Sequence, residues 1–157
     1  MYKTVIWATD GFDGAEAGLQ AALQVAKLTN GRVVAVHCDQ RLQGRAAPYP
    51  ALPDEEDIRL KLRRQVDELK ADGLDIELVV RYSHKKPADV VASVAREIGA
   101  DIIVCGTRGA GAVSGALLGS FTPRLLHVAP CPVLAVRVGA EVDPVNAKVA
   151  ERLGVAG

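Results

Sequence analysis

The hydrophobic and polar positions of this chain follow two patterns that alternate along its length. Short unbroken apolar runs, as at residues 5–8 and 102–105, are typical of parallel strands that are covered on both faces. The stretches between these runs place apolar residues three or four positions apart, as at Ile58, Leu62 and Val66, which is the period of an amphipathic helix. The alternation predicts one parallel sheet with helices on both faces, joined by right-handed crossovers.

The same pattern predicts where the elements begin and end. Strands are expected at 2–9, 32–38, 74–82, 102–105 and 132–138, and helices at 13–31, 54–73, 87–99 and after 120. Asp13 and Glu16 have the spacing of a capping box at the start of the first helix, and Gly31 is expected to end that helix. Pro87 and Gly99 are expected to begin and end the third helix.

Two segments fall outside the alternation. Residues 39–53, with Gly44 and prolines at 48, 50 and 53, are expected to form an exposed, mobile loop. A loop of that length in a compact domain is often functional, and a flexible insertion is the alternative. The chain after residue 138 is expected to be a tail with a short helix at 145–153, so the domain is expected to span residues 1–138.

Composition narrows the classes of function. With 157 residues, 49% apolar and 24% charged, the chain is long enough for one soluble domain with a substantial core. Basic and acidic residues number 19 each and aromatic residues make up 4%, which argues against nucleic acid and anionic membranes as partners. The sequence has no apolar run of membrane-helix length and no signal-peptide pattern at its start. Cysteines 38, 105 and 131, an odd number beside apolar strands, favour reduced thiols and a cytoplasmic location.

One stretch, residues 101–132, carries the candidate chemistry. Its apolar run is followed by glycines at 106, 109, 111, 115 and 119, and then by the hydroxyls of Ser120 and Thr122 at the start of a helical pattern. Glycine lets the backbone approach a ligand closely, and a helix start offers unpaired N–H groups and a positive dipole end. The main hypothesis is therefore that this stretch binds the phosphates of a nucleotide. The loop after the first strand, with Thr9 and Asp10, is expected to face the same crevice, and Cys38 to border it.

Other phosphate-binding and catalytic motifs do not fit these glycines. A P-loop beginning at Gly106 would need lysine after Gly111, where the chain continues Ala-Val. The dinucleotide fingerprint beginning at Gly109 would need glycine in place of Ser114, and no G-x-S-x-G nucleophile elbow occurs. The histidines lack metal-ligand spacing, and His37 is expected to be packed or hydrogen-bonded at the rim of the sheet. No metal site is therefore expected.

The spacing of the glycines resembles a known signature. Gly106, Gly109 and, after nine further residues, Gly119-Ser120 give G-x2-G-x9-G-[ST], which resembles the nucleotide-binding motif of the universal stress protein family. The opening VIWATDGFDGAEAGLQAA is similar to that family's first strand, aspartate loop and first helix, and APCPVLAV is similar to its last strand. The similarity extends from Tyr2 to Arg137.

The resemblance implies a three-layer α/β/α sandwich, Rossmann-like and of the adenine nucleotide alpha hydrolase-like type, with a five-stranded parallel sheet in the order 3-2-1-4-5. It also implies that ATP binds, with or without Mg²⁺. By resemblance, Asp10 contacts the ribose region, Ala8 and Thr9 line the adenine side, and Cys38 meets adenine through its backbone. The residues implied around the ribose and phosphates are Gly106, Thr107, Arg108 and Gly109, followed at the phosphate end by Gly119, Ser120, Phe121 and Thr122. Pro123 is a departure from the family pattern, because proline has no N–H and so removes one donor from the first turn of the phosphate-binding helix.

Several of these residues have a structural alternative. Asp10 could cap its own turn, although Asp13 is better placed to cap the helix. Arg108 could be a solvated loop cation instead of an anion contact. Ser120 and Thr122 could act as helix caps, a role that is compatible with phosphate contact.

Three classes of function follow from this pattern. The first is an adenine-nucleotide-binding stress-response regulator with slow or no hydrolysis, since no second carboxylate accompanies Asp10 beside the glycine loop. The second is an adenylating or ATP-hydrolysing enzyme, which is disfavoured because the first strand is followed by neither an S-G-G-x-D-S loop nor a paired-histidine motif. The third is an interaction module without nucleotide; AMP, ADP or cyclic AMP could also replace ATP. In the expected strand order the apolar last strand lies at an edge, which predicts a homodimer through the segment from Val133 to Val138.

Overall fold

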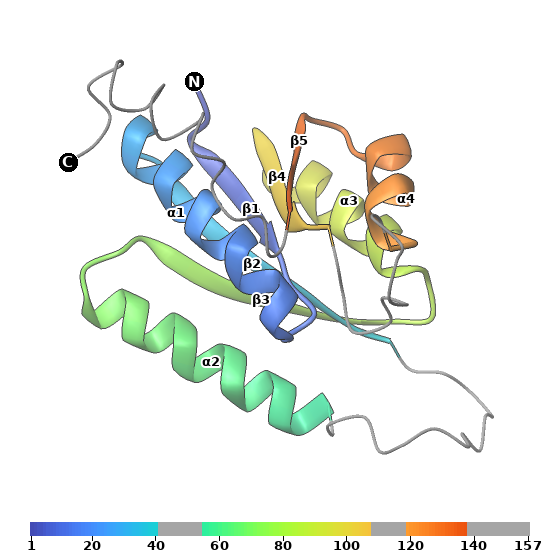
Figure 1. Cartoon of the computed structure of the whole chain (residues 1–157), viewed down its shortest axis with the longest axis horizontal. Coiled ribbons are helices and arrows are strands. Elements are labelled where there is room, and N and C mark those ends of the chain that lie inside the picture. Colours follow the sequence, from blue (N-terminus) through green and yellow to red (C-terminus); the bar gives the residue numbers. More distant parts are fainter. Residues whose placement is uncertain (41–54, 108–118, 138–157) are drawn as a thin grey trace.

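Figure 1 shows the computed structural model, which describes residues 1–40, 55–107 and 119–137. Its strands are β1 (Thr4–Ala8), β2 (Arg32–Gln40), β3 (Ile76–Ser83), β4 (Ile102–Gly106) and β5 (Val133–Val136). Its α-helices are α1 (Glu16–Thr29), α2 (Glu55–Ala71), α3 (Pro87–Ile98) and α4 (Phe121–Val128), and a short 3₁₀ helix, η1 (Asp13–Ala15), precedes α1. The predicted loop beyond residue 40, most of the glycine-rich loop and the predicted tail helix lie outside the described residues.

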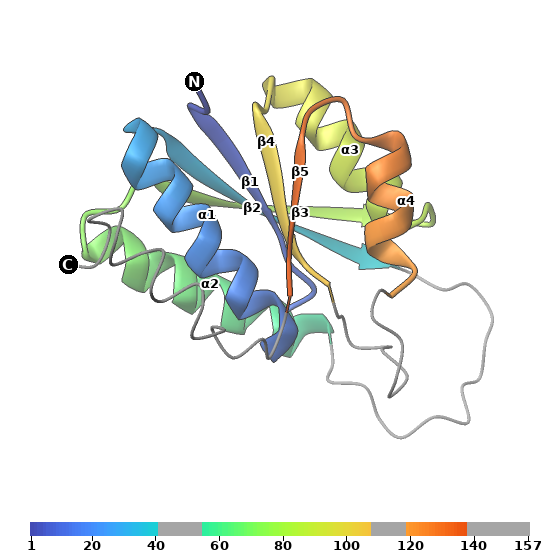
Figure 2. The ribbon, with the colours of Figure 1, turned by 45° about the horizontal axis from the view of Figure 1, so that its top comes forward.

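The strands form one parallel sheet in the order β3-β2-β1-β4-β5. β1 is central, because Val5 lies beside Val33 of β2 on one side and beside Ile102 of β4 on the other. Helices α1 and α2 cover one face of the sheet, and α3 and α4 cover the other (Figure 2). The predicted fold class and strand order are therefore confirmed.

β1 contributes to the core on both faces of the sheet. Val5 and Trp7 pack in the layer formed with α1 and α2, whereas Ile6 and Ala8 pack in the layer formed with α3 and α4. These four side chains are at most 6% exposed. Burial on both faces explains why the strand is an unbroken apolar run and not an alternating one.

Trp7 also anchors the segment between β1 and α1. Its indole Nε1–H donates a hydrogen bond of 2.9 Å to the carbonyl oxygen of Ala15, and the ring is fully buried. This bond ties the last residue of η1 to the core, and with it the start of α1, which follows directly.

Asp13 does not occupy the capping position of α1, where the predicted capping box would place it. Asp13 belongs to η1, and α1 begins at Glu16 with Ala15 in the capping position and no side-chain cap. The N–H of Ala15 bonds to the carbonyl of Phe12 at 2.9 Å, so the turn closes before the helix begins. The Glu16 carboxylate accepts a hydrogen bond from Gln65 of α2 at 2.6 Å.

The glycines at the helix ends have different reasons for being glycine. At the end of α1, Asn30 with φ 49° takes the left-handed conformation that was expected of Gly31. Gly31 is needed for space instead, because a Cβ there would lie 2.7 Å from the carbonyl oxygen of Lys3. Pro87 and Gly99 begin and end α3 as predicted, and Gly99 has φ 62°.

Strand ends deviate from the prediction at the rim of the sheet. β2 continues to Gln40, because β3 still pairs with Asp39 and Gln40 beyond the apolar run. The prediction of a loop that begins at Asp39 is therefore wrong at its first two residues. β1 is shorter than predicted and ends at Ala8, although the Thr9 N–H still bonds to the Val36 carbonyl at 3.0 Å.

Candidate functional site

The candidate site lies beyond the carboxyl ends of β1 and β4, which are neighbours in the sheet. Ala8 of β1 pairs with Cys105 of β4. The helix that follows β1 covers one face of the sheet, and the helix that follows β4 covers the other (Figure 2). In open α/β sheets, a crevice for ligands forms where the crossovers diverge in this way.

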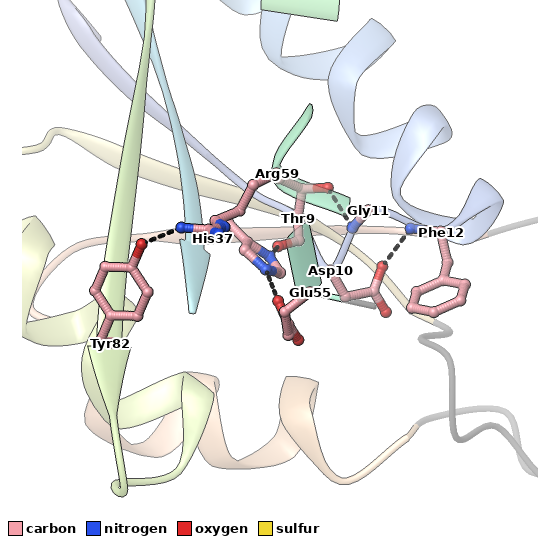
Figure 3. A network of polar contacts seen from close by, with 8 residues as sticks. All are labelled: Thr9, Asp10, Gly11, Phe12, His37, Glu55, Arg59 and Tyr82. Carbon is pink, nitrogen blue, oxygen red and sulfur yellow. Dashed lines mark hydrogen bonds and ion pairs between the residues drawn. The ribbon is translucent and has the colours of Figure 1, made fainter. Parts of the chain in front are cut away.

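On the β1 side, the first residues after the strand form a tight hydrogen-bonded turn (Figure 3). The Thr9 hydroxyl accepts from the N–H of Gly11 at 3.1 Å, and Asp10 Oδ1 accepts from the N–H of Phe12 at 3.1 Å. Gly11 has φ 82°, a conformation that glycine adopts without strain. Asp10 therefore does cap its own turn, which was one of the two roles expected for it.

On the β4 side, the two ends of the glycine-rich loop are joined. The N–H of Thr107 bonds to the carbonyl of Val136 in β5 at 2.9 Å, so the strand ladder reaches the loop. The N–H of Gly119 then bonds to the carbonyl of Thr107 at 3.2 Å. A Cβ built on Gly119 would meet no heavy atom of the described residues within 4 Å. Arg108 and Gly109 lie outside the described residues.

The hydroxyls at the start of α4 point to different surroundings. Ser120 is exposed, occupies the capping position and makes no side-chain capping hydrogen bond. Thr122 is 1% exposed, and its hydroxyl lies 3.4 Å from the carbonyl oxygen of Gly106 and 4.0 Å from Cys105 Sγ. Phe121 is partly buried against the core. Ser120 can thus contact a ligand, whereas Thr122 holds the helix against the end of β4.

Cys38 lies on β2, two residues before the end of that strand and not at the end as expected. The side chain is half-buried, and burial, followed by the negative charges of Asp39 and Glu55, raises its pKa to about 11. The thiol is therefore neutral near pH 7, which suits a packing role better than a nucleophilic one.

His37 is hydrogen-bonded at the rim of the sheet, as predicted. The residue is 2% exposed, with Nδ1 3.0 Å from the carbonyl oxygen of Thr9 and Nε2 2.9 Å from Glu55 Oε2 (Figure 3). Sequence reasoning missed Glu55, because an acidic residue in the first turn of a helix has an ordinary explanation in the helix dipole.

Among residues 1–40, 55–107 and 119–137, no group of three or more His, Cys, Asp or Glu side chains could hold a metal ion. No described helix is long and apolar enough to cross a membrane.

A family model named "Universal stress protein family" matches residues 1–137. The chain belongs to the universal stress protein family. Among curated members, a universal stress protein of Thermus aquaticus, encoded in the 3′ region of a QAH/OAS sulfhydrylase gene, is 32% identical over 148 residues. That alignment covers 87% of this chain and 100% of the relative.

Solved structures of the family share the fold. A universal stress protein in complex with cAMP is 30% identical, with a TM-score of 0.65, over 86% of this chain and 97% of that one. A universal stress protein from Archaeoglobus fulgidus in complex with dAMP is 26% identical, with a TM-score of 0.63, over 87% of this chain and 98% of that one. Members of this family with the same sheet therefore bind adenine nucleotides.

Proposed function

We propose that this protein binds an adenine nucleotide, with ATP as the first candidate, and acts as a stress-response regulator with slow or no hydrolysis. The nucleotide would lie in the crevice between the Thr9–Asp10 turn and the start of α4. Main-chain N–H groups and the Ser120 hydroxyl would receive its phosphates.

The observation that carries this proposal is the start of α4, where no atom of the described residues occupies the space beside Gly119. Gly119 has no described heavy atom within 4 Å of its Cβ position, and the exposed Ser120 hydroxyl beside it makes no capping bond. The helix behind them directs its positive dipole end and its unpaired N–H groups toward the same space. Pro123 removes one donor from this turn, and the remaining donors still favour an anion.

The relatives support the class of ligand. The solved proteins with cAMP and dAMP carry an adenine base and a phosphate group. Adenine, a pentose and a phosphate are therefore the common chemistry. ATP, ADP and AMP differ in the number of phosphates, and cyclic AMP differs from AMP in the second ester bond of its phosphate.

Slow or absent hydrolysis is proposed from the chemistry of the β1 turn. Hydrolysis of ATP needs a positioned water and a held Mg²⁺. Asp10 is the carboxylate that the sequence offers for positioning that water. It accepts a hydrogen bond from the N–H of Phe12, which fixes the side chain in the turn. Turnover above about 1 per second would be typical of an enzyme and would contradict this part of the proposal.

Titration calorimetry with ATP, ADP, AMP and cyclic AMP tests the binding. Gly119→Val should keep the fold, since its side chain meets no atom of the described residues, but should weaken ATP binding at least about tenfold by occupying the space of the ligand. Ala71→Val, at the exposed end of α2, is the matched control and should bind as the wild type does. A folded Gly119→Val protein with wild-type affinity, or no binding of any of the four nucleotides, would refute the site.

We also propose that the protein forms a homodimer and is located in the cytoplasm. β5 is an edge strand whose Leu134 is 38% exposed, and an apolar edge favours pairing with a second copy. Cysteines 38, 105 and 131 are all free thiols, as expected in a reducing compartment.

A further inference from the structure

A buried histidine at the carboxyl end of β2 has both ring nitrogens directed at oxygen acceptors (Figure 3). His37 Nδ1 lies 3.0 Å from the Thr9 carbonyl oxygen, and Nε2 lies 2.9 Å from Glu55 Oε2. Thr9 follows β1, and Glu55 is the first residue of α2. One ring therefore bridges three elements, one of which ends at the candidate nucleotide site.

These contacts require two protons. A carbonyl oxygen can only accept, so Nδ1 must carry a hydrogen to bond to Thr9. A neutral imidazole then has a lone pair on Nε2, which would face the lone pairs of the Glu55 carboxylate. Only a second proton, on Nε2 or shared with Glu55, makes both contacts hydrogen bonds. The bond to Glu55 is then charge-assisted, and its 2.9 Å length fits that class.

The titratable and charged groups around His37 come from the elements packed against it. They are Asp10 after β1, Asp39 on β2, Tyr82 on β3, and Glu55, Arg59 and Lys61 on α2. Asp39 and Glu55 place carboxylates beside this part of β2 and raise the pKa of the neighbouring Cys38, for which burial is the larger cause. Arg59 donates to the Tyr82 hydroxyl, and Lys61 donates to the Gly11 carbonyl at 2.8 Å.

We propose that His37 is a proton-dependent positioning residue for the nucleotide crevice. The doubly protonated ring ties the Thr9 carbonyl to Glu55, and loss of the second proton breaks this tie while the bond from Lys61 to the Gly11 carbonyl remains. This inference rests on the proposed function, because the turn that His37 holds contains Thr9 and Asp10 of the candidate site. Nucleotide affinity is therefore expected to fall as the pH rises and His37 loses its second proton.

Glu55→Gln separates this role from simple packing. The variant has the same shape, and its amide can donate to the lone pair of a neutral Nε2, so the bridge no longer needs the second proton. The Glu55 side chain is 40% exposed, which makes the substitution tolerable. Wild-type affinity for ATP should fall about threefold to tenfold between about pH 5 and about pH 8, relative to Glu55→Gln measured alongside. Comparing the two proteins cancels the titration of the ATP phosphates themselves.

Nuclear magnetic resonance of the ring nitrogens measures the protonation state of His37 in the absence of nucleotide. The wild-type ring of His37 should carry protons on both nitrogens at the acidic end and lose one as the pH rises. In Glu55→Gln it should hold the neutral tautomer with hydrogen on Nδ1 across most of that range. His127→Gln, on the exposed surface of α4, is the control and should leave the His37 signals unchanged.

The outcomes separate the two proposals. A His37 ring that keeps one protonation state from about pH 5 to about pH 8 would overturn the inference, as would identical affinity profiles for wild type and Glu55→Gln. If the ring titrates as expected but no nucleotide binds, the proton-dependent bridge stands and the proposed function fails.

Discussion

The two hydroxyls at the start of α4 have different surroundings, so removing them should have different effects. Ser120 is exposed and makes no capping bond, whereas Thr122 is 1% exposed and contacts the Gly106 carbonyl at 3.4 Å. The informative variants are Ser120→Ala and Thr122→Val. Each removes one hydroxyl and adds no bulk.

The expected magnitudes follow from these surroundings. Thr122→Val should lower the free energy of unfolding by about 0.5–1.5 kcal/mol, near the lower end because the contact is long, and should change ATP affinity less than about twofold. Ser120→Ala should change the free energy of unfolding by less than about 0.5 kcal/mol, since no folded-state bond is lost. Its loss of one phosphate hydrogen bond should weaken ATP binding by about 1 kcal/mol, or about fivefold.

Urea denaturation and titration calorimetry on the same preparations measure both quantities. Equal denaturant slopes for the variants and the wild type would show that the free energies can be compared. The reasoning would be refuted if Thr122→Val weakened ATP binding as much as Ser120→Ala did while stability stayed the same. It would also be refuted if Ser120→Ala bound ATP with wild-type affinity.

Three further predictions concern other parts of the chain. The carboxylate of Asp101 accepts hydrogen bonds from the N–H groups of Thr4 and Lys3, which lowers its pKa. Asp101→Asn should therefore destabilise the fold near pH 7, and the difference in stability between variant and wild type should vanish as the pH falls through that lowered pKa. A pH-independent difference in urea denaturation would contradict this prediction. Leu134→Lys should convert the proposed dimer to a monomer in light scattering, and an unchanged mass at micromolar concentration would argue against pairing through β5. Because burial raises the pKa of Cys38 to about 11, iodoacetamide should alkylate it more slowly in the folded protein than in urea, as followed by mass spectrometry; faster labelling in the folded state would show that the thiol is activated.

The sheet could be predicted from the sequence because its strands are buried on both faces. The apolar runs around Ile6 and Ile103 have no other simple explanation, and the helices between them present clear apolar faces. Details that depend on tertiary contacts could not be predicted. The η1 turn, whose last residue accepts a hydrogen bond from the Trp7 indole, lies where the sequence pattern predicted the first turn of α1.

For the candidate site, the sequence identified the segments better than the roles of single side chains. The position of Thr122 in the motif suggested a phosphate contact, but its helical phase turns the hydroxyl inward toward Gly106. Asp10 and Phe12 form a turn that the sequence allowed but did not require. The pairing of His37 with Glu55 depends on how α2 packs on the sheet, and no local pattern encodes that distance.

The tryptophan of β1 gives the protein a built-in optical reporter. The chain contains one tryptophan, and that indole is fully buried with its N–H bonded to the Ala15 carbonyl. Its fluorescence therefore comes from a single dry environment next to the turn that carries Thr9 and Asp10. A red shift of the emission would signal that water has reached the indole, so loosening of the segment between β1 and α1 can be followed without attaching a dye.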